Sequence, residues 1–116
     1  MKLSIITVVY KNLVGLRVTG ASIAVQKCRD FEWIVIDGGS DDGTKEYLST
    51  SGHAPSYWVS ERDKGIYDAM NKGLRAAHGE YVLFLNAGDR IADENGLSNL
   101  MSGQLTADVV FGDLNF

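Results

Sequence analysis

The chain has 116 residues, 45% of them hydrophobic and 22% charged, which are the proportions of a folded globular domain rather than a disordered segment. Eleven lysine and arginine residues stand against fifteen aspartate and glutamate residues, and the net charge of −4 argues against nucleic acid as the main partner. The single cysteine, Cys28, cannot form an internal disulfide, and no apolar stretch has the length of a membrane span. We therefore expect a soluble cytoplasmic protein, with membrane association only through partners or regions outside this chain.

Apolar runs in the first half of the chain predict strands that alternate with helices. Leu3 to Val9 is expected to be a strand, because the run is too short for a signal peptide and lacks a cleavage site. A helix is expected over Asn12 to Lys27, and a second strand over Phe31 to Ile36. In the loop that follows, either Asp41 or Asp42 can cap a short helix.

The second half of the chain continues this alternation and contains the clearest helix signal. Tyr57 to Val59 predicts a short strand. Asp63 is then a candidate helix N-cap and Gly79 a C-terminal stop, because apolar residues between them recur at spacings of three and four. Tyr81 to Leu85 is expected to be a strand buried on both faces. The last two expected elements are a short helix and a fifth strand, at Asp93–Met101 and Ala107–Phe111.

Alternating strands and helices predict an α/β fold in which crossover connections build a mostly parallel sheet. No helix follows the fifth strand, which would leave part of that strand uncovered. We therefore expect residues 1–116 to be part of a larger domain. The sequence has no internal repeat, low-complexity tract or interdomain linker.

Several common kinds of site are excluded by their missing motifs. The turn after the first strand, Tyr10-Lys11-Asn12, has no glycine, so a dinucleotide-binding fingerprint is absent, as is a phosphate-binding Walker loop. A catalytic serine elbow is also missing. His53 and His78 are isolated, and no cysteine–histidine cluster has the spacing of zinc ligands.

Polar side chains stand instead at the ends of the predicted strands, where ligands bind in open α/β sheets. They are Asp37, Asp63, Asn86, Asp89 and Asp113. Oxygen ligands of this kind suit a hard cation such as Mg²⁺ or Mn²⁺, which often bridges carboxylates to phosphates. A simpler interpretation makes Asp37 a turn residue, Asp89 a cap and Asp63 a helix N-cap.

Four blocks, taken together, resemble glycosyltransferase family 2, whose members have the GT-A fold. The combination spans nearly the whole chain and is similar to the N-terminal, donor-binding part of bacterial enzymes for exopolysaccharide, capsule or lipopolysaccharide biosynthesis. The resemblance implies a Rossmann-like, three-layer α/β/α domain that is truncated, with its acceptor-binding part missing. The blocks are Ser4–Asn12, Ser22–Gln26 with Val35–Thr44, Glu61–Gly73 and Gly79–Asp89.

The resemblance also implies which residues bind the donor nucleotide. Thr7, Val8 and Tyr10 would line the pocket for the base and ribose, with Tyr10 packing on the base. Asp37 would accept a hydrogen bond from the base. Asp63 and Asn71 would lie beside the ribose and diphosphate.

The expected metal motif departs from the family pattern. Asn86 and Gly88 stand where the family usually has acids, which leaves Asp89 as the single expected metal ligand. One carboxylate can still hold Mg²⁺ or Mn²⁺, because the ion takes further ligands from water and phosphates. Gly38 likewise replaces a common second aspartate.

The implied reaction is transfer of a sugar from a nucleoside diphosphate, with UDP-sugars favoured, to a glycan or lipid-linked acceptor, with inversion. The general base is expected beyond Phe116, so this chain alone is expected to bind donor weakly and transfer nothing. One alternative is a degenerate, non-catalytic nucleotide-binding or assembly module, which the lone Asp89 favours. Another is a nucleotidyltransferase, although Tyr10-Lys11-Asn12 lacks the glycine- and arginine-rich loop of that class.

Overall fold

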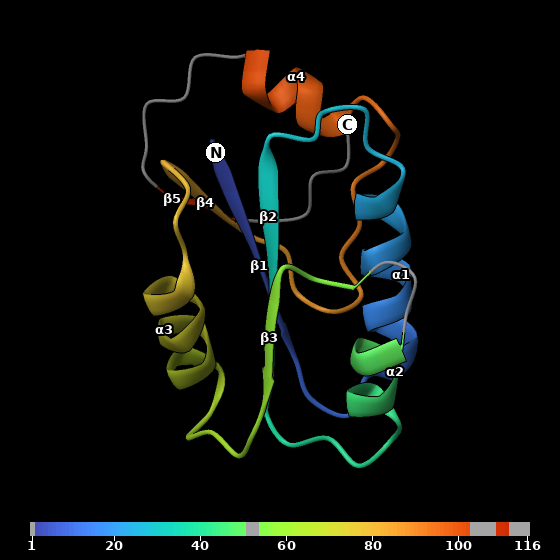
Figure 1. Cartoon of the computed structure of the whole chain (residues 1–116), viewed down its shortest axis with the longest axis vertical. Coiled ribbons are helices and arrows are strands. Elements are labelled where there is room, and N and C mark those ends of the chain that lie inside the picture. Colours follow the sequence, from blue (N-terminus) through green and yellow to red (C-terminus); the bar gives the residue numbers. More distant parts are fainter. Residues whose placement is uncertain (1, 51–53, 103–108, 112–116) are drawn as a thin grey trace.

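The computed structural model describes residues 2–50, 54–102 and 109–111, which form a parallel sheet flanked by helices (Figure 1). The strands among these residues lie in the order β3-β2-β1-β4-β5, and all neighbours are parallel. The predicted α/β class is therefore confirmed. In chain order the elements are β1 (Leu3–Val9), α1 (Leu13–Ala24), β2 (Phe31–Asp37), α2 (Thr44–Thr50), β3 (Tyr57–Ser60), α3 (Ile66–Ala76), β4 (Tyr81–Phe84), α4 (Gly96–Ser102) and β5 (Val109–Phe111).

Helices cover both faces of the sheet, which gives three layers (Figure 1). Helix α3 packs on one face, while α1, α2 and α4 lie on the other side. Neighbouring residues of β1 consequently enter different cores: Ile5 packs with Leu16 of α1, whereas Ile6 packs with Ala69 of α3. Burial on both faces explains why the central strands are apolar runs rather than alternating polar and apolar residues.

Helix α1 is shorter than predicted: it ends at Ala24, whereas the prediction placed its end at Lys27. The segment that follows is held by side-chain hydrogen bonds instead. The buried Gln26 donates from Nε2 to the Asp93 carbonyl (2.7 Å), and its Oε1 accepts from the Leu97 amide (3.0 Å). These two bonds anchor the end of α1 to the start of α4.

The two boundaries predicted for α3 were wrong. Its N-cap is Gly65, whose φ of 116° lies in the region that favours glycine, and not Asp63. The helix ends at Ala76, before Gly79. Gly79 serves close packing: a Cβ there would lie 2.7 Å from the carbonyl carbon of Leu3, so a side chain would push the loop away from β1.

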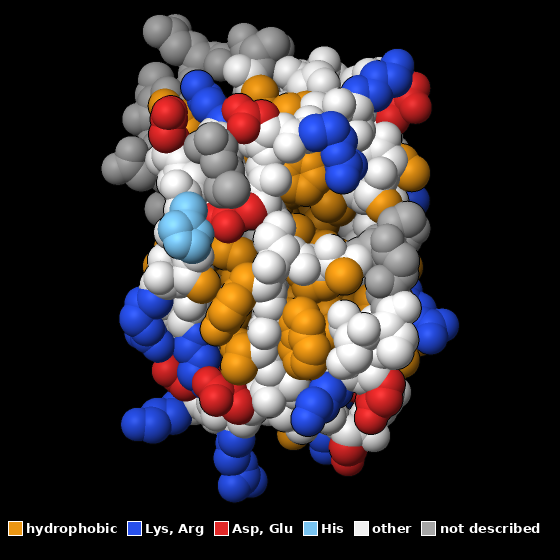
Figure 2. Space-filling view, viewed as in Figure 1, with side chains coloured by type: hydrophobic (Ala, Val, Ile, Leu, Met, Phe, Trp, Pro, Cys, Tyr) orange, Lys and Arg blue, Asp and Glu red, His pale blue; other side chains and the backbone are white. Residues whose placement is uncertain are grey.

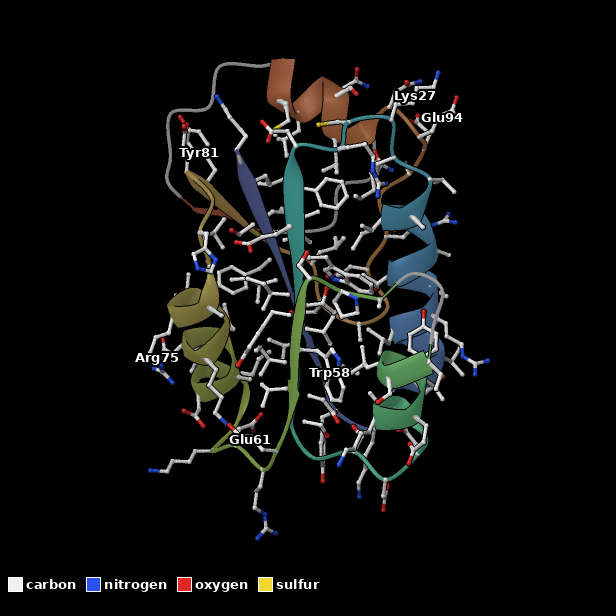
Figure 3. The ribbon with its side chains drawn as sticks, viewed as in Figure 1. Lys27, Trp58, Glu61, Arg75, Tyr81 and Glu94 are labelled. Atoms are coloured by element: carbon white, nitrogen blue, oxygen red, sulfur yellow. The ribbon has the colours of Figure 1, made fainter. Side chains whose placement is uncertain are left out.

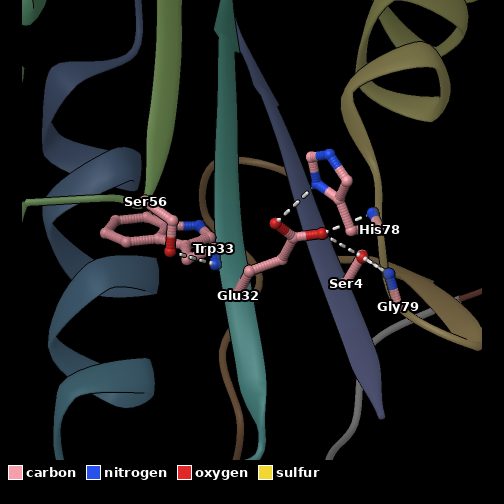
Figure 4. Close-up of polar contacts among 6 residues, drawn as sticks. All are labelled: Ser4, Glu32, Trp33, Ser56, His78 and Gly79. Carbon is pink, nitrogen blue, oxygen red and sulfur yellow. Dashed lines mark hydrogen bonds and ion pairs between the residues drawn. The ribbon is translucent and has the colours of Figure 1, made fainter. Parts of the chain in front are cut away.

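A buried carboxylate fastens the amino-terminal half of the sheet (Figure 4). Glu32 of β2 accepts hydrogen bonds at Oε2 from the Ser4 hydroxyl and the His78 amide, both at 2.6 Å. Ser4 in turn accepts from the Gly79 amide (2.8 Å). Burial raises the pKa of Glu32, but the hydrogen bonds from Ser4 and His78 outweigh it and hold the pKa below its ordinary value. The network ties β1, β2 and the α3–β4 connection together.

Strand β3 lies at an edge of the sheet, and apolar side chains lie on both sides of it in Figure 2. Trp58 points toward the side of α2, and Glu61, just beyond the strand, lies on the side of α3 (Figure 3). Glu61 pairs there with Lys72 of α3 at 3.1 Å. This pair connects the end of β3 to the helix that follows it.

Candidate functional site

A cavity of about 490 Å³ opens at the carboxyl ends of the central strands. Its wall includes Val8 and Tyr10 at the end of β1, Gly38 after β2, Asp63 before α3 and Asn86 after β4. These residues come from four separate connections that the parallel sheet brings to one edge. Ligands of open α/β sheets bind at this edge, so the cavity lies where the strand-end residues predicted a site.

The β1–α1 connection presents Tyr10 to this cavity. Lys11 has a φ of 50°, unusual for a residue with a side chain, and its amide donates to the Ser40 hydroxyl at 2.7 Å. Asn12 caps α1 and donates from Nδ2 to the Ala87 carbonyl (3.4 Å). These contacts fix the turn, and Tyr10 projects from it with 58% of its surface exposed.

Asp37 lies behind the cavity wall rather than on it. The residue is fully buried, and its carboxylate accepts hydrogen bonds from the hydroxyls of Ser40 (2.5 Å) and Ser60 (2.7 Å). It also accepts from the Ser40 amide (3.2 Å). In this arrangement Asp37 joins the loop after β2 to the end of β3, and the base contact expected of it stays a prediction.

Asp63 is the carboxylate that reaches the cavity. Its Oδ1 accepts from the Gly65 amide (3.0 Å), so the side chain shapes the turn before α3 instead of capping the helix. Its Oδ2 lies 2.9 Å from the place where a Cβ on Gly38 would sit, and Cδ1 of Tyr10 lies 3.3 Å from the same point. Three connections thus meet at Gly38.

Asn86 lines the cavity and also has a buried side-chain oxygen. Its Oδ1 is a buried atom without a hydrogen-bond partner among the described residues. Its amide donates to Asp89 Oδ2 (3.1 Å), and its carbonyl accepts from the Asp89 amide (2.9 Å). Buried polar oxygens are nearly always hydrogen-bonded, so this unpartnered oxygen sets Asn86 apart from the other polar side chains around the cavity.

Sequence reasoning missed Thr19, which organises the loop around Asn86. Its buried hydroxyl on α1 donates to the Asp89 carbonyl (2.6 Å) and accepts from the Gly88 amide (3.1 Å). Gly88 has a φ of 101°, so the loop needs a glycine there. The sequence feature that could have pointed to this residue is a polar threonine on the buried face of a predicted helix.

Two predicted donor-binding residues lie away from the cavity. Thr7 is fully buried and accepts a hydrogen bond from the indole Nε1 of Trp33 (2.9 Å). It shares the strand face of Ile5, which packs on the α1 side, because alternate residues of a strand point to opposite faces. Asn71 is exposed on α3 and takes no part in the cavity wall.

Of the two aspartates considered as caps of α2, Asp42 is the one whose carboxylate binds the first residue of the helix, although Gly43 directly precedes the helix. Its Oδ1 accepts from the hydroxyl (2.5 Å) and amide (3.3 Å) of Thr44, and its Oδ2 accepts from the Leu13 amide (3.1 Å). The hydrogen bond from the Thr44 hydroxyl is the main reason why the pKa of Asp42 lies below its ordinary value. The loop after β2 is thereby attached to the start of α1.

The described residues do not form a metal-binding cluster by themselves. No group of three or more histidine, cysteine, aspartate or glutamate side chains in residues 2–50, 54–102 and 109–111 could hold an ion. Asp89 uses Oδ2 to accept from the Asn86 amide. Asn86 Oδ1 and the other oxygen of Asp89 are hard ligands, so they fit Mg²⁺ or Mn²⁺ only together with oxygens from water or a phosphate.

A parallel sheet of this order, with a cavity where its strands end, defines a doubly wound α/β protein, a class in which ligands bind at this edge of the sheet. Comparison with known families sharpens this class. Residues 4–112 match Glycosyl transferase family 2, and the chain therefore belongs to that family.

Two mycobacterial glycosyltransferases are similar in sequence. A glycosyltransferase of Mycobacterium tuberculosis is 44% identical over 90 residues, which cover 77% of this chain and 34% of the relative. The PGL/p-HBAD biosynthesis glycosyltransferase of Mycobacterium bovis is 37% identical over 103 residues, covering 80% and 39%. The chain thus spans about a third of the length of these curated relatives.

Solved structures agree with the fold. A mannosyltransferase of Pyrobaculum calidifontis in complex with GDP-Man and Mn²⁺ superimposes with a TM-score of 0.74 at 26% identity, over 86% of this chain and 31% of that one. TarS of S. aureus in complex with UDP-GlcNAc gives 0.76 at 25% identity, over 88% and 30%. The GT-A fold predicted from the sequence is confirmed. No helix in the described part of the chain is long and apolar enough to cross a membrane.

Proposed function

We propose that the cavity at the carboxyl ends of β1, β2 and β4 binds the nucleotide of a nucleoside-diphosphate sugar. The observation that carries the proposal is the cavity at the strand ends, where Tyr10, Asp63 and Asn86 from three separate connections share one wall. The exposed ring of Tyr10 can stack on a base, and Asp63 and Asn86 can accept hydrogen bonds from ribose or base. Val8 adds apolar surface.

The charge of the wall suits the rest of such a donor. Arg62 is the cationic residue of the cavity wall, and it is exposed, so its guanidinium can meet a diphosphate. The free oxygens of Asn86 and Asp89 could hold Mg²⁺ or Mn²⁺ once the diphosphate supplies further ligands. Such a cation would stabilise negative charge on the leaving nucleoside diphosphate.

In the whole protein we propose that the bound sugar is transferred, with inversion, to a glycan or lipid-linked acceptor. The family and the donors in similar structures support this proposal: GDP-Man for the mannosyltransferase and UDP-GlcNAc for TarS. UDP-sugars are our first candidates. We place the general base outside residues 1–116, so this chain alone should bind donor without transferring sugar.

Calorimetric titration of the chain with UDP, UDP-GlcNAc and GDP-mannose, with and without Mn²⁺, tests the proposal. We expect a uridine or guanosine diphosphate to bind, more tightly with Mn²⁺, and Asn86→Ala to weaken binding about tenfold through the lost acceptor. The exposed Asn71→Ala is the matched control. Equal, weak binding of every nucleotide by both variants and the parent would contradict the proposal.

One observation favours a second candidate, a nucleotide-binding module without catalytic function. The carboxylate of Asp89 already accepts a hydrogen bond from the Asn86 amide, as a purely structural loop residue would. In that case nucleotide binding would be independent of Mn²⁺. The same titration therefore separates the two candidates.

A further inference from the structure

The connection between β4 and α4, residues 85–95, is neither helix nor strand, and it supplies Asn86 and Ala87 to the cavity wall. Its first turn is held from one side by β1, because the Ala87 amide donates to the Val8 carbonyl (3.2 Å). The rest of the connection passes along α1 on its way to α4 (Figure 1). A segment without a helix or a strand ladder needs partners elsewhere for its backbone groups, so those partners decide its shape.

Helix α1 offers these partners as a row of three polar side chains, Thr19, Ser22 and Gln26. Their spacing of three and four residues places them on one side of the helix. The Ser22 hydroxyl accepts from the Ile91 amide (3.1 Å), and Gln26 Nε2 donates to the Asp93 carbonyl (2.7 Å). The polar row therefore holds the connection at successive points, from the cavity at Thr19 to the start of α4 at Gln26.

Thr19 is the member of the polar row that meets the turn at the cavity. Its Oγ1 lies 2.6 Å from the carbonyl oxygen of Asp89 and 3.2 Å from that of Asn86, and it accepts from the Gly88 amide at 3.1 Å. The carbonyl of Gly15, in its own helix, is also 3.1 Å away. A hydroxyl has a single proton to donate, and the nearest acceptor is the Asp89 carbonyl. Three backbone groups of one turn thus converge on one buried oxygen.

We infer that Thr19 is a positioning residue of the cavity: its hydroxyl sets the turn that carries Asn86 and Ala87 in the wall. The inference rests on the proposed function and deepens it. Thr19 is fully buried and does not belong to the wall, so it acts on a ligand only through the turn. Ser22 and Gln26 hold the part of the connection that leads away from the cavity.

Loss of the hydroxyl would leave two backbone groups without a partner. Among the described residues, the Gly88 amide and the Asp89 carbonyl have no hydrogen bond other than the one with Thr19. An unpaired polar group away from water costs free energy, so the turn would move until water or another group pairs with these two. Asn86 and Ala87 would move with it, and a binding site weakens when its wall leaves the geometry that fits the ligand.

Thr19→Val tests the role of the hydroxyl, because valine keeps the shape of the side chain and removes its oxygen. We expect calorimetric titration to show about tenfold weaker UDP binding. Thr19→Ser restores the hydroxyl and should bind UDP within about threefold of the parent. Parent-like binding by Thr19→Val, or failure of Thr19→Ser to bind better than Thr19→Val, would overturn the inference.

Gln26→Leu is the matched control from the far end of the same row. It removes the hydrogen bonds to Asp93 and Leu97, so urea unfolding should show a loss of stability at least as large as that of Thr19→Val. Its UDP affinity should nevertheless stay within about twofold of the parent, since Gln26 holds α4 and not the cavity turn. Equal losses of affinity in the two variants would make Thr19 a purely structural residue.

A measurement without ligand separates this inference from the proposed function. In NMR spectra of the ligand-free chain, Thr19→Val should move the amide proton of Gly88 to lower frequency, as loss of a hydrogen bond does, and Gln26→Leu should leave it in place. In the parent this proton should show the weak temperature dependence of a hydrogen-bonded amide. The dependence of a solvent-exposed amide would overturn the inference even if no variant folds. A parent chain that binds no nucleotide would overturn the proposed function, whereas an unmoved Gly88 proton in a chain that binds UDP would overturn the role of Thr19 alone.

Discussion

The two ends of β2 each carry a buried carboxylate, yet neither belongs to the cavity wall. Glu32, in the amino-terminal half of the strand, is hydrogen-bonded by Ser4 and His78, and Asp37, at its carboxyl end, by Ser40 and Ser60. The oxygens of the cavity, Oδ2 of Asp63 and Oδ1 of Asn86, have no such partners among the described residues. Two carboxylates of one strand are thus bound to the protein itself, whereas Asp63 and Asn86 on the cavity wall each keep one oxygen that the described residues do not use.

The largest effect on stability is expected from Asp37→Ala. The substitution leaves the hydroxyls of Ser40 and Ser60 and the Ser40 amide without their acceptor, which should cost about 3 kcal/mol of unfolding free energy. Urea unfolding measures it. Asp63→Ala, with one backbone partner, should cost less than about 1 kcal/mol. Equal losses of unfolding free energy in the two variants would contradict the contrast between Asp37 as a structural residue and Asp63 as a residue of the cavity wall.

Glu32→Gln should be next in size, at about 2 kcal/mol, because the amide replaces charged acceptor oxygens that receive hydrogen bonds from Ser4 and His78. Nucleotide affinity should stay within about twofold, since the change lies far from the cavity wall. Urea unfolding and titration with UDP measure the two quantities. A large loss of affinity at full stability would show that the amino-terminal half of the sheet belongs to the site.

The pH dependence of stability should follow from Glu32. Its pKa in the folded protein is lowered, so the folded state binds the proton less readily than the unfolded state, in which glutamate has a pKa of about 4.3. The stabilisation is therefore complete above that value and is lost as the pH falls through the folded pKa. Unfolding free energies of the parent and Glu32→Gln should converge between neutral pH and pH ~3, and parallel curves would assign the acid sensitivity elsewhere.

The smallest effect on stability is expected from Asn86→Ala. An acceptor that has no partner adds nothing to the folded state, so its removal should change the unfolding free energy by less than about 0.5 kcal/mol. Thermal unfolding without ligand measures this change in stability. With UDP present, the variant should also lose the stabilisation that the ligand gives to the parent chain. A clear destabilisation without ligand would mean that Asn86 supports the loop rather than the ligand.

The sequence predicted the order of strands and helices because their apolar runs and breaks are local properties. The GT-A fold and the family followed from motif blocks that this chain shares with its relatives. Boundaries were less certain where tertiary contacts decide them: α1 stops at Ala24 because Gln26 is drawn into the core, and α3 starts after Gly65.

The strand ends could be predicted as the place of the site, but not the direction of each side chain. Thr7 and Val8 are neighbours in the sequence, but Val8 lines the cavity whereas the buried Thr7 hydroxyl accepts a hydrogen bond from the Trp33 indole. Whether Asp37 or Asp63 faces the cavity depends on tertiary contacts, such as the hydrogen bond from Ser60 to Asp37, that the sequence alone does not show. Gly38 departs from the family pattern, and the structure places it beside Asp63 and Tyr10, a contact that the sequence does not show.

The hydroxyl of Thr19 links α1 mechanically to the turn at Gly88 and Asp89. One side chain holds both an amide and a carbonyl of that turn, so a movement of the turn relative to α1 would stretch or break both bonds. Occupation of the cavity should therefore be felt along the helix, as slower amide exchange at Gly88 and in the adjoining turn of α1.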